Sequence, residues 1–313
     1  MKNLLRITDL LRRTAYGILA HDSLNMAQAA AYSAMVALFP ALIVLAALLA
    51  WLPVFGPVQL QVGAFFDQIL PPSVFPLLTR YFGSSTQTHT TRLLVVAVVV
   101  SLSGASSVIA TLMEGLRRAE DLPNDCWGFW ERRRRSFLLV PLSFIPLAVA
   151  TALVMFGEFI TQWLADSMST SMRPVFYGLT LAARWSLAVA AVASVTAVLY
   201  HLGVPAVLDV AGSDAQSARP RRIPRGWTRT LPGAVVATVV WFATTLGFGW
   251  YVTRFANYNQ VYGPLGAGIA LLFWLYIVFL SVLTGAEFNA QLRLSYPAPP
   301  APGTNPDTPN AIG

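Results

Sequence analysis

Residues 262–289 read YGPLGAGIALLFWLYIVFLSVLTGAEFN, and this stretch decides the fold class of the chain. It overlaps a run from Phe255 to Ala286 that holds 32 residues and no charged side chain. About 20 apolar residues rising about 1.5 Å each cross a hydrocarbon core of about 30 Å, so the run predicts a transmembrane helix. Gly285, Glu287 and Asn289 follow where that helix should leave the lipid.

The composition of the whole chain indicates that this span is one of several. Of 313 residues, 56% are hydrophobic and 11% are charged, against a charged share of about 25% in soluble domains. The single cysteine, Cys126, excludes a disulfide within the chain and a site built from several cysteines. We therefore predict an all-α, polytopic membrane protein with no cofactor and no metal.

Apolar runs divide the chain into three parts. Residues 1–25 predict a basic amphipathic helix at the membrane surface, with a soluble helix packed under the bundle as the alternative. Residues 26–293 predict a six-helix domain, and residues 294–313 a Pro-rich disordered tail. The spans are expected at 29–52, 93–113, 137–157, 178–202, 231–253 and 263–290, with kinks at Pro40, Pro141 and Pro146. Residues 53–92 and 158–173 are expected to form outer loops.

The positive charges predict the orientation of the spans. Sixteen of the 21 Lys and Arg residues fall in the N-terminal segment, the two basic loops and the tail, and five fall in the other segments. Since cytoplasmic loops carry the excess of Lys and Arg, both termini are expected in the cytoplasm. The same distribution argues against a nucleic-acid partner, because no groove-reading motif accompanies the arginines.

Small and hydroxylated residues recur at helical spacing within the spans. Small residues let helices approach closely in lipid, and the residues expected at helix contacts are Ala30, Ala34, Ala37, Ala41, Gly263, Gly266 and Gly268. Ser103, Ser107 and Thr111 form a polar stripe along the second span. This stripe either lines a passage or bonds a neighbouring helix or its own backbone, and the bonding role is the more common one.

Three motifs resemble the YihY/BrkB family, formerly labelled ribonuclease BN. They are AAAYSAMVALFP at residues 29–40, PGAVVATVVWF at 232–242, and YGPLGAGIALLFWLY with GAEFNA within 262–290. Where family members carry a second aromatic residue after the tyrosine of the first motif, this chain has Ser33. The resemblance implies a six-helix protein of the bacterial inner membrane whose proposed roles run from serum resistance to transport.

The sequence does not support an enzyme. A hydrolase needs clustered carboxylates or histidines to hold metal ions or to activate water, and no catalytic motif is present. His21, His89 and His201 fall in three different segments, so we expect no common site and no catalytic residue. Acidic residues of the basic loops, such as Glu120 and Asp125, have arginines nearby and predict ordinary charge pairing.

Ionisable residues inside spans favour a transporter. The candidate pathway or coupling residues are Glu287, Asn289, Arg184 and the polar stripe Ser103, Ser107 and Thr111. As alternatives, Glu287 pairs with a loop arginine and Arg184 extends toward the interface. We predict a transporter or flippase-like permease for a lipid or small amphiphile. A non-transporting scaffold for envelope assembly, with envelope proteins or further copies of the chain as partners, is the alternative.

Overall fold

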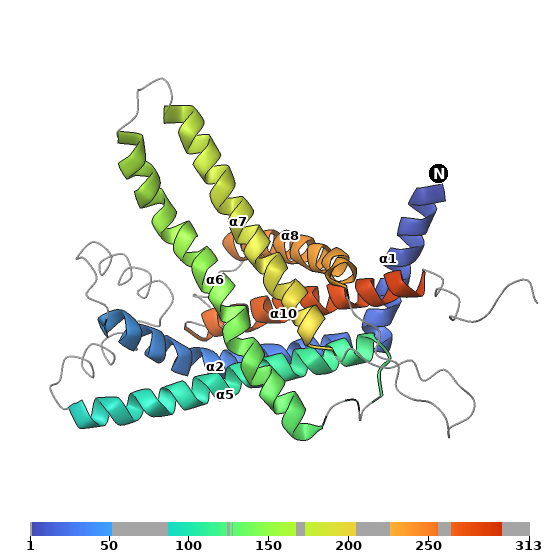
Figure 1. Cartoon of the computed structure of the whole chain (residues 1–313), viewed down its shortest axis with the longest axis horizontal. Helices are drawn as coiled ribbons and strands as arrows, with labels where there is room; N and C mark the ends of the chain where they lie inside the picture. The colour runs from blue at the N-terminus through green and yellow to red at the C-terminus, as the bar shows by residue number, and fades with distance from the viewer. Residues whose placement is uncertain are drawn as a thin grey trace, which may run out of the picture.

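The computed structural model describes residues 2–51, 87–123, 126, 128–166, 173–204, 226–255 and 264–295, and most of these residues are helical. These residues form seven α-helices and one short 3-10 helix, and none of them is in a strand (Figure 1). The predicted all-α class is confirmed.

Six of the helices are long and apolar enough to cross a membrane, as predicted. They are α2 (Ser23–Trp51), α5 (Gln87–Ala119), α6 (Phe129–Asp166), α7 (Arg173–Leu202), α8 (Leu231–Phe255) and α10 (Pro264–Leu294). The first helix, α1 (Lys2–Ala20), precedes them, and the 3-10 turn η2 (Trp227–Arg229) leads into α8.

The helices extend beyond the spans expected from hydropathy. Helix α5 already includes residues 87–92, and α6 continues to Asp166, so both include residues predicted as outer loop. A helix satisfies its own backbone hydrogen bonds, and it can therefore continue past the hydrocarbon core into the polar interface. Helices α2 and α6 also run without interruption through their prolines. The rest of the 53–92 loop, up to residue 86, and the tail from residue 296 lie outside the described residues.

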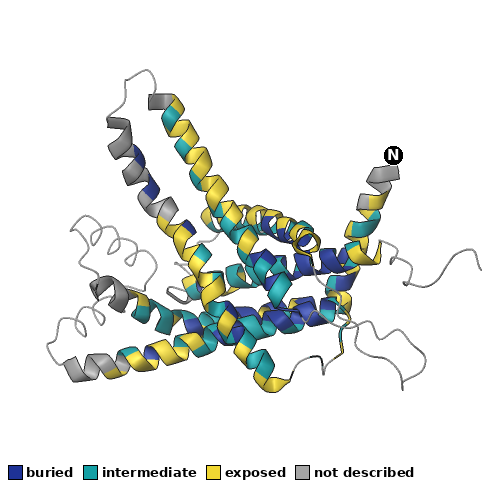
Figure 2. Cartoon of the chain, viewed as in Figure 1, coloured by how far each residue is buried: buried dark blue, intermediate teal, exposed yellow. Residues whose placement is uncertain are grey.

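The helices converge at one end of the bundle, which we call the packed end. Here α2, α6 and α8 begin and α5, α7 and α10 end (Figure 1). Buried residues gather at this end in Figure 2, and they form one core cluster. Its large members include Leu112, Met113, Leu116, Leu139, Leu199, Tyr200 and Leu283.

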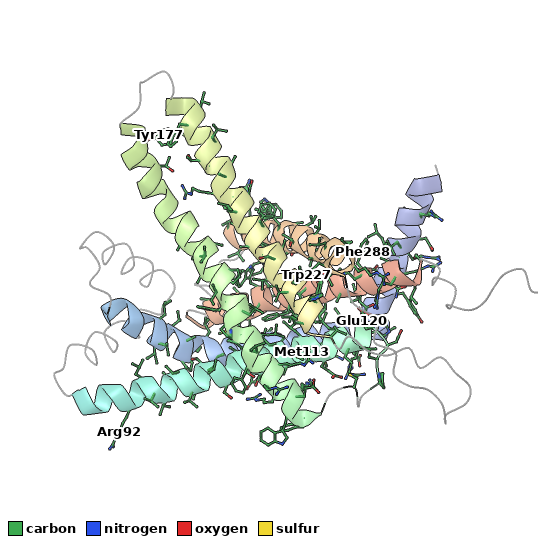
Figure 3. The ribbon with its side chains drawn as sticks, viewed as in Figure 1. Arg92, Met113, Glu120, Tyr177, Trp227 and Phe288 are labelled. Atoms are coloured by element: carbon green, nitrogen blue, oxygen red, sulfur yellow. The ribbon has the colours of Figure 1, made fainter. Side chains whose placement is uncertain are left out.

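Away from the packed end, α6 and α7 separate from the other helices and form a two-helix hairpin (Figure 1). From residue 175, where burial is described, to residue 188 of α7, the half-buried positions are 176, 180, 184 and 188, a spacing of four that follows one helix face. The residues between them are exposed and include Val175, Tyr177, Leu179, Leu181, Trp185 and Leu187. Figure 3 shows Tyr177 and Arg92 at helix ends far from Met113 and Glu120.

Helix α1 leaves the packed end and contacts the bundle through a narrow stripe. Thr14 and Gly17 are buried, whereas Leu11, Tyr16 and Leu19 are largely exposed. Exposed Arg12 and Arg13 pair with Asp9 on the same helix. Helix α1 therefore leaves apolar and basic side chains uncovered, as a helix lying at a membrane surface would.

Candidate functional site

The candidate site begins where α8 and α10 cross at the packed end. Gly233 on α8 and Gly285 on α10 face each other so closely that a Cβ atom added to either residue would overlap the carbonyl oxygen of the other. Only glycine permits this approach of two backbones in lipid. The crossing brings together the GAEFNA and PGAVVATVVWF motifs.

The side-chain amide of Asn289 on α10 links the two helices by hydrogen bonds to the start of α8. Its Oδ1 accepts the backbone N–H of Gly233 at 2.7 Å, and its Nδ2 donates to the carbonyl of Thr230 at 3.0 Å. Asn289 is only 5% exposed, so these bonds satisfy both ends of a buried amide. Asn289 was a candidate pathway residue in the sequence, and the structure places it as a link between α8 and α10.

Tyr200 links α7 to α10 near the same crossing. Its hydroxyl donates to the carbonyl of Val282 on α10, and the ring is buried in the core. Beside it lies a cavity of about 10 Å³ that Tyr200, Asn289 and Arg293 help to line. Arg293 forms an ion pair with Glu120 at the end of α5. Three helices are thus joined to α10 within its last turns.

Glu287, two residues after Gly285 on α10, is fully buried, and its carboxyl group bonds to His21 in the turn between α1 and α2. Its Oε1 lies 2.7 Å from Nδ1 of His21. Its Oε2 has no hydrogen-bond partner and is packed against Gly17 of α1, where an added Cβ would lie 2.5 Å from this oxygen. Gly17 therefore makes the space that the carboxyl group occupies.

The other ring nitrogen of His21 faces a second carboxylate. Nε2 lies 3.2 Å from Oδ1 of Asp121, which follows α5 and is 78% exposed. His21 and Asp121 line a recess of about 360 Å³ at the packed end, together with Ala20, Asp22, Arg117, Arg118 and Leu122. Asp22 and Asp121 both adopt positive φ, 58° and 51°, which Asp tolerates better than most residues. These two turns position the walls of the recess.

The arginines of the recess are held by carboxylates. Glu114 accepts from Arg117 Nη2 at 2.6 Å and from Arg118 Nε at 3.2 Å. Arg117 also donates to the carbonyl of Leu122, and Arg118 donates to Asp22 at 3.3 Å. The end of α5 is thereby tied to the turn that follows it and to the α1–α2 corner.

The partner of Glu287 differs from the one that the sequence suggested. The expected alternative was a loop arginine, and no single histidine was considered as a partner of Glu287. In the structure His21 pairs with Glu287 across 266 positions of sequence. Sequence reasoning missed His21 and Asp121 because neither lies in a motif. The available signal was that the α1–α2 corner and the end of α10 were predicted on the same membrane side.

The polar stripe of α5 divides into bonds within the helix and bonds to α6. Ser107 donates to the carbonyl of Ser103 at 3.1 Å, and Thr111 donates to that of Ser107 at 2.9 Å. The hydroxyl of Ser103 accepts from Arg133 at 3.3 Å. A buried pair that the sequence did not single out, Ser106 and Ser136, joins the same two helices at 2.9 Å.

Arg184 lies in the seam of the α6–α7 hairpin, away from Glu287. A Cβ atom added to Gly157 of α6 would lie 2.9 Å from Cδ and Nε of Arg184, so the glycine makes room for the side chain. Arg184 is half-buried there. The structure does not bring Arg184 and Glu287 into one site.

The predicted packing residues lie mainly at the contacts of α2. Ala30 and Ala37 are buried, and Ala34 packs against the core cluster. A Cβ atom added to Gly104 of α5 would lie 2.5 Å from the Cβ of Ala37, which marks the closest described approach of these helices at a glycine. Ala41 is half-buried, Gly266 is buried, and Gly268 lies near Met35. Gly263 lies outside the described residues.

Comparison with known proteins gives the class of this chain. The sequence model of the family described as Virulence factor BrkB matches residues 14–308, nearly the whole chain. The protein therefore belongs to the BrkB family of membrane proteins, which confirms the resemblance.

Curated relatives share this assignment at low identity. A Bacillus subtilis protein named as ribonuclease-like, YfkH, is 27% identical over 87% of this chain and 91% of its own length. A protein of Tolumonas auensis named UPF0761 membrane protein is 26% identical over 87% of this chain and 82% of its own. A Xanthomonas campestris protein that is also named UPF0761 membrane protein is 25% identical over 92% of this chain. This match covers 63% of the length of the Xanthomonas protein. No solved structure matches the chain.

Proposed function

We propose that the protein is a transporter or flippase-like permease of the bacterial inner membrane and that it moves a lipid or small amphiphile. The observation that carries this proposal is the α6–α7 hairpin, which is packed with the bundle at one end only. Beyond that end its exposed residues are almost all apolar, while the half-buried Arg184 lies in its seam.

Such a hairpin offers both chemical features of an amphiphile-binding surface. Its exposed Leu, Val and aromatic side chains suit acyl chains, and a guanidinium at membrane depth attracts an anionic headgroup. Charged residues are costly in a span and are found where they line a polar pathway or pair with another group. Arg184 lies 11 residues into α7, which at about 1.5 Å per residue places it about 16 Å from the helix start.

The proposed orientation puts the packed end in the cytoplasm. Among the described residues, this end carries Arg117, Arg118, Arg132–Arg135, Arg229 and Arg293, whereas the opposite helix ends carry Arg92, Arg173 and Arg254. The positive-inside rule favours the cytoplasmic side for the more basic end. The amphiphile would then enter the hairpin region from the outer leaflet or leave by it.

We propose transport in preference to ribonuclease activity, although the name of one relative contains that word. Arg117 and Arg118 of the recess pair with Glu114 and Asp22, and no motif of the sequence supplies a nucleophile with its base. A purified sample that cleaves RNA, and loses this activity in a Glu287→Gln variant, would contradict the proposal.

Reconstitution tests the transport proposal directly. Vesicles of phosphatidylethanolamine and phosphatidylglycerol would carry traces of phospholipids with a fluorescent headgroup label, and an impermeant reductant would quench the label in the outer leaflet. We expect quenching beyond one leaflet in protein-containing vesicles and a loss of this excess with Arg184→Gln. The matched control is Arg134→Gln, an exposed arginine of the packed end.

A second probe, a small fluorescent amphiphilic cation trapped inside the same vesicles, tests the other substrate class. If wild-type protein moves neither probe faster than protein-free vesicles do, the transport proposal fails and the scaffold alternative gains. In that case, stable copurification with envelope proteins under mild detergent is the expected result.

A further inference from the structure

His21 lies between two carboxyl groups, and this geometry sets how many protons the three residues hold. Its Nδ1 is 2.7 Å from Glu287 Oε1, and its Nε2 is 3.2 Å from Asp121 Oδ1. A neutral imidazole has one N–H and one lone pair, so it can donate at only one of these contacts. For both contacts to be hydrogen bonds, the three groups together must hold at least two protons.

Two arrangements place two protons while the exposed carboxyl group of Asp121 stays ionised. In the first, His21 is an imidazolium that donates to both carboxylates. In the second, the Nε2–H of His21 donates to Asp121, while Glu287 is a carboxylic acid whose Oε1 hydroxyl donates to Nδ1. Transfer of one proton from Nδ1 to Oε1 converts the first arrangement into the second. The transfer neither gains nor loses a proton, and its donor and acceptor are already at hydrogen-bond distance.

Exposure falls along the three residues from the recess into the bundle. The side chains of Asp121, His21 and Glu287 are 78%, 20% and 0% exposed. At the inner end, Oε2 of Glu287 makes no hydrogen bond and is packed against Gly17. Burying a carboxyl oxygen that has no hydrogen-bond partner costs free energy of folding. We therefore infer that the carboxyl group of Glu287 changes its protonation state.

The other charged groups around the recess are paired with each other. Arg117 and Arg118 both bond Glu114, and Arg118 also bonds Asp22. On α1 the buried carboxyl group packs against Gly17, and the uncharged side chain of Gln291 on α10 lies beside the same glycine. Within the described residues, His21 is the ionisable side chain that the structure places in direct contact with Glu287.

We propose that Asp121, His21 and Glu287 form a proton-binding relay that carries protons from the aqueous recess to the carboxyl group of Glu287 inside the bundle. When the relay loses one of its two protons, the Nε2 lone pair of His21 faces the carboxylate of Asp121, and that contact becomes repulsive. Proton loss thus loosens the hold of the α1–α2 corner on the end of α5. If the protein transports, the proton is its coupling ion, and this last step alone rests on the proposed function.

Infrared difference spectroscopy on the purified full chain tests the relay. We expect wild-type protein to show a carboxylic acid C=O band that changes with pH, with loss of this band in Glu287→Gln. His21→Gln should shift the pH midpoint by about one to two units, the equivalent of one charged hydrogen bond. The matched control, Glu131→Gln, removes a half-exposed carboxylate paired with Arg135 on α6 and should leave the band unchanged.

Two further measurements keep the test decisive. Wild-type protein labelled with ¹³C-glutamate should show the band displaced, whereas ¹³C-aspartate should leave it in place, so a glutamate is identified even if Glu287→Gln does not fold. Asp121→Asn should keep the band but delay its appearance after a pH jump. An unchanged band in a folded Glu287→Gln variant, or an unchanged midpoint in His21→Gln, would overturn the relay.

The relay and the transport proposal fail in different ways. Proteoliposomes that move no probe, made from protein with the expected infrared band, would refute transport and retain the relay. Probe movement by protein without the band would refute the relay and retain transport. With both present, an imposed pH gradient should change the rate of probe movement in wild type and leave it unchanged in His21→Gln.

Discussion

Asn289 caps helix α8 from another helix: its Oδ1 accepts the backbone N–H of Gly233 at 2.7 Å. Helix α8 begins at Leu231, so this N–H belongs to the first turn, whose donors have no partner within the helix. An N-cap residue usually supplies the acceptor from its own chain position. The residue before α8, Thr230, instead directs its hydroxyl to the carbonyl of Trp227. Asn289 therefore replaces the local cap and ties the start of α8 to α10.

Asn289→Ala should lower the thermal stability of the detergent-solubilised protein. It removes a cap worth about 0.5–2 kcal/mol and leaves the buried N–H of Gly233 without its partner. The carbonyl of Thr230 keeps only its bond from the backbone N–H of Ala234. The melting temperature of Asn289→Asp should fall between those of wild type and Asn289→Ala, because aspartate keeps the acceptor for Gly233 but loses the donor to Thr230. Asn25→Ala serves as the control, since Asn25 is exposed and makes only a long bond to Asp22. Equal melting temperatures for the alanine variants would contradict a capping role.

The glycines of α8 should differ sharply in their response to alanine. At Gly233, and at Gly285 on the partner helix, the added methyl group meets backbone of the other helix, and overpacking of this kind costs about 1–3 kcal/mol. At Gly249 no atom lies within 4 Å of the added Cβ, so alanine should leave stability equal or raise it by up to about 1 kcal/mol. Thermal unfolding of the three variants, followed by circular dichroism, measures the difference. A Gly285→Ala protein as stable as Gly249→Ala would show that the helices do not cross here.

The sequence predicted the number and order of the spans because each span is a long apolar run of residues with few charged side chains. It also singled out Glu287 through the GAEFNA match. It could not predict the partner of Glu287, because His21 lies in the turn after α1 and no local pattern indicates that Gly17 would pack on α10. Similarly, Asn289 and Gly233 stand in two quoted motifs, yet only the crossing of α8 and α10 shows that one caps the other. Contacts between distant segments depend on helix rotation and crossing, which hydropathy does not record.

Larger side chains on the small-residue face of α2 should disrupt its packing on α5. At Ala37, α2 and α5 are so close that even a Cβ atom added to Gly104 would lie 2.5 Å from the Cβ of Ala37, so Ala37→Leu has no room for its side chain. Ala34→Leu enlarges a residue that packs against the core. Both should reduce the yield of folded protein in mild detergent more than Val44→Leu, which changes a half-buried residue by one methylene group. Gel filtration of equal membrane preparations gives the measurement. Similar monodisperse yields for all three would remove the packing role of this face.

Burial raises the pKa of the Cys126 thiol, and this should be visible in its labelling rate. The thiolate is the reactive form, so a raised pKa leaves less of it at neutral pH. Maleimide labelling of Cys126 should therefore keep accelerating with pH after a control cysteine has reached its plateau. Ser295→Cys in a Cys126→Ser background provides the control, because Ser295 is exposed at the end of α10. Coincident pH profiles in the folded proteins would contradict the raised pKa, and denaturant should abolish any difference.

The proposed orientation makes opposite predictions for two loops that lie outside the described residues. With Cys126 replaced, Ser84→Cys should react with an impermeant maleimide added to intact cells, because it belongs to the predicted outer loop. Ser217→Cys should react only after permeabilisation, because it lies in a basic segment leading to the packed end. The physical reason is the excess of Lys and Arg at that end, since arginine-rich loops remain on the cytoplasmic side. The relay depends on the same orientation, as its recess opens at the packed end beside Asp121. Labelling of Ser217→Cys in intact cells, with Ser84→Cys protected, would invert the topology and make the relay take its protons from the outer side.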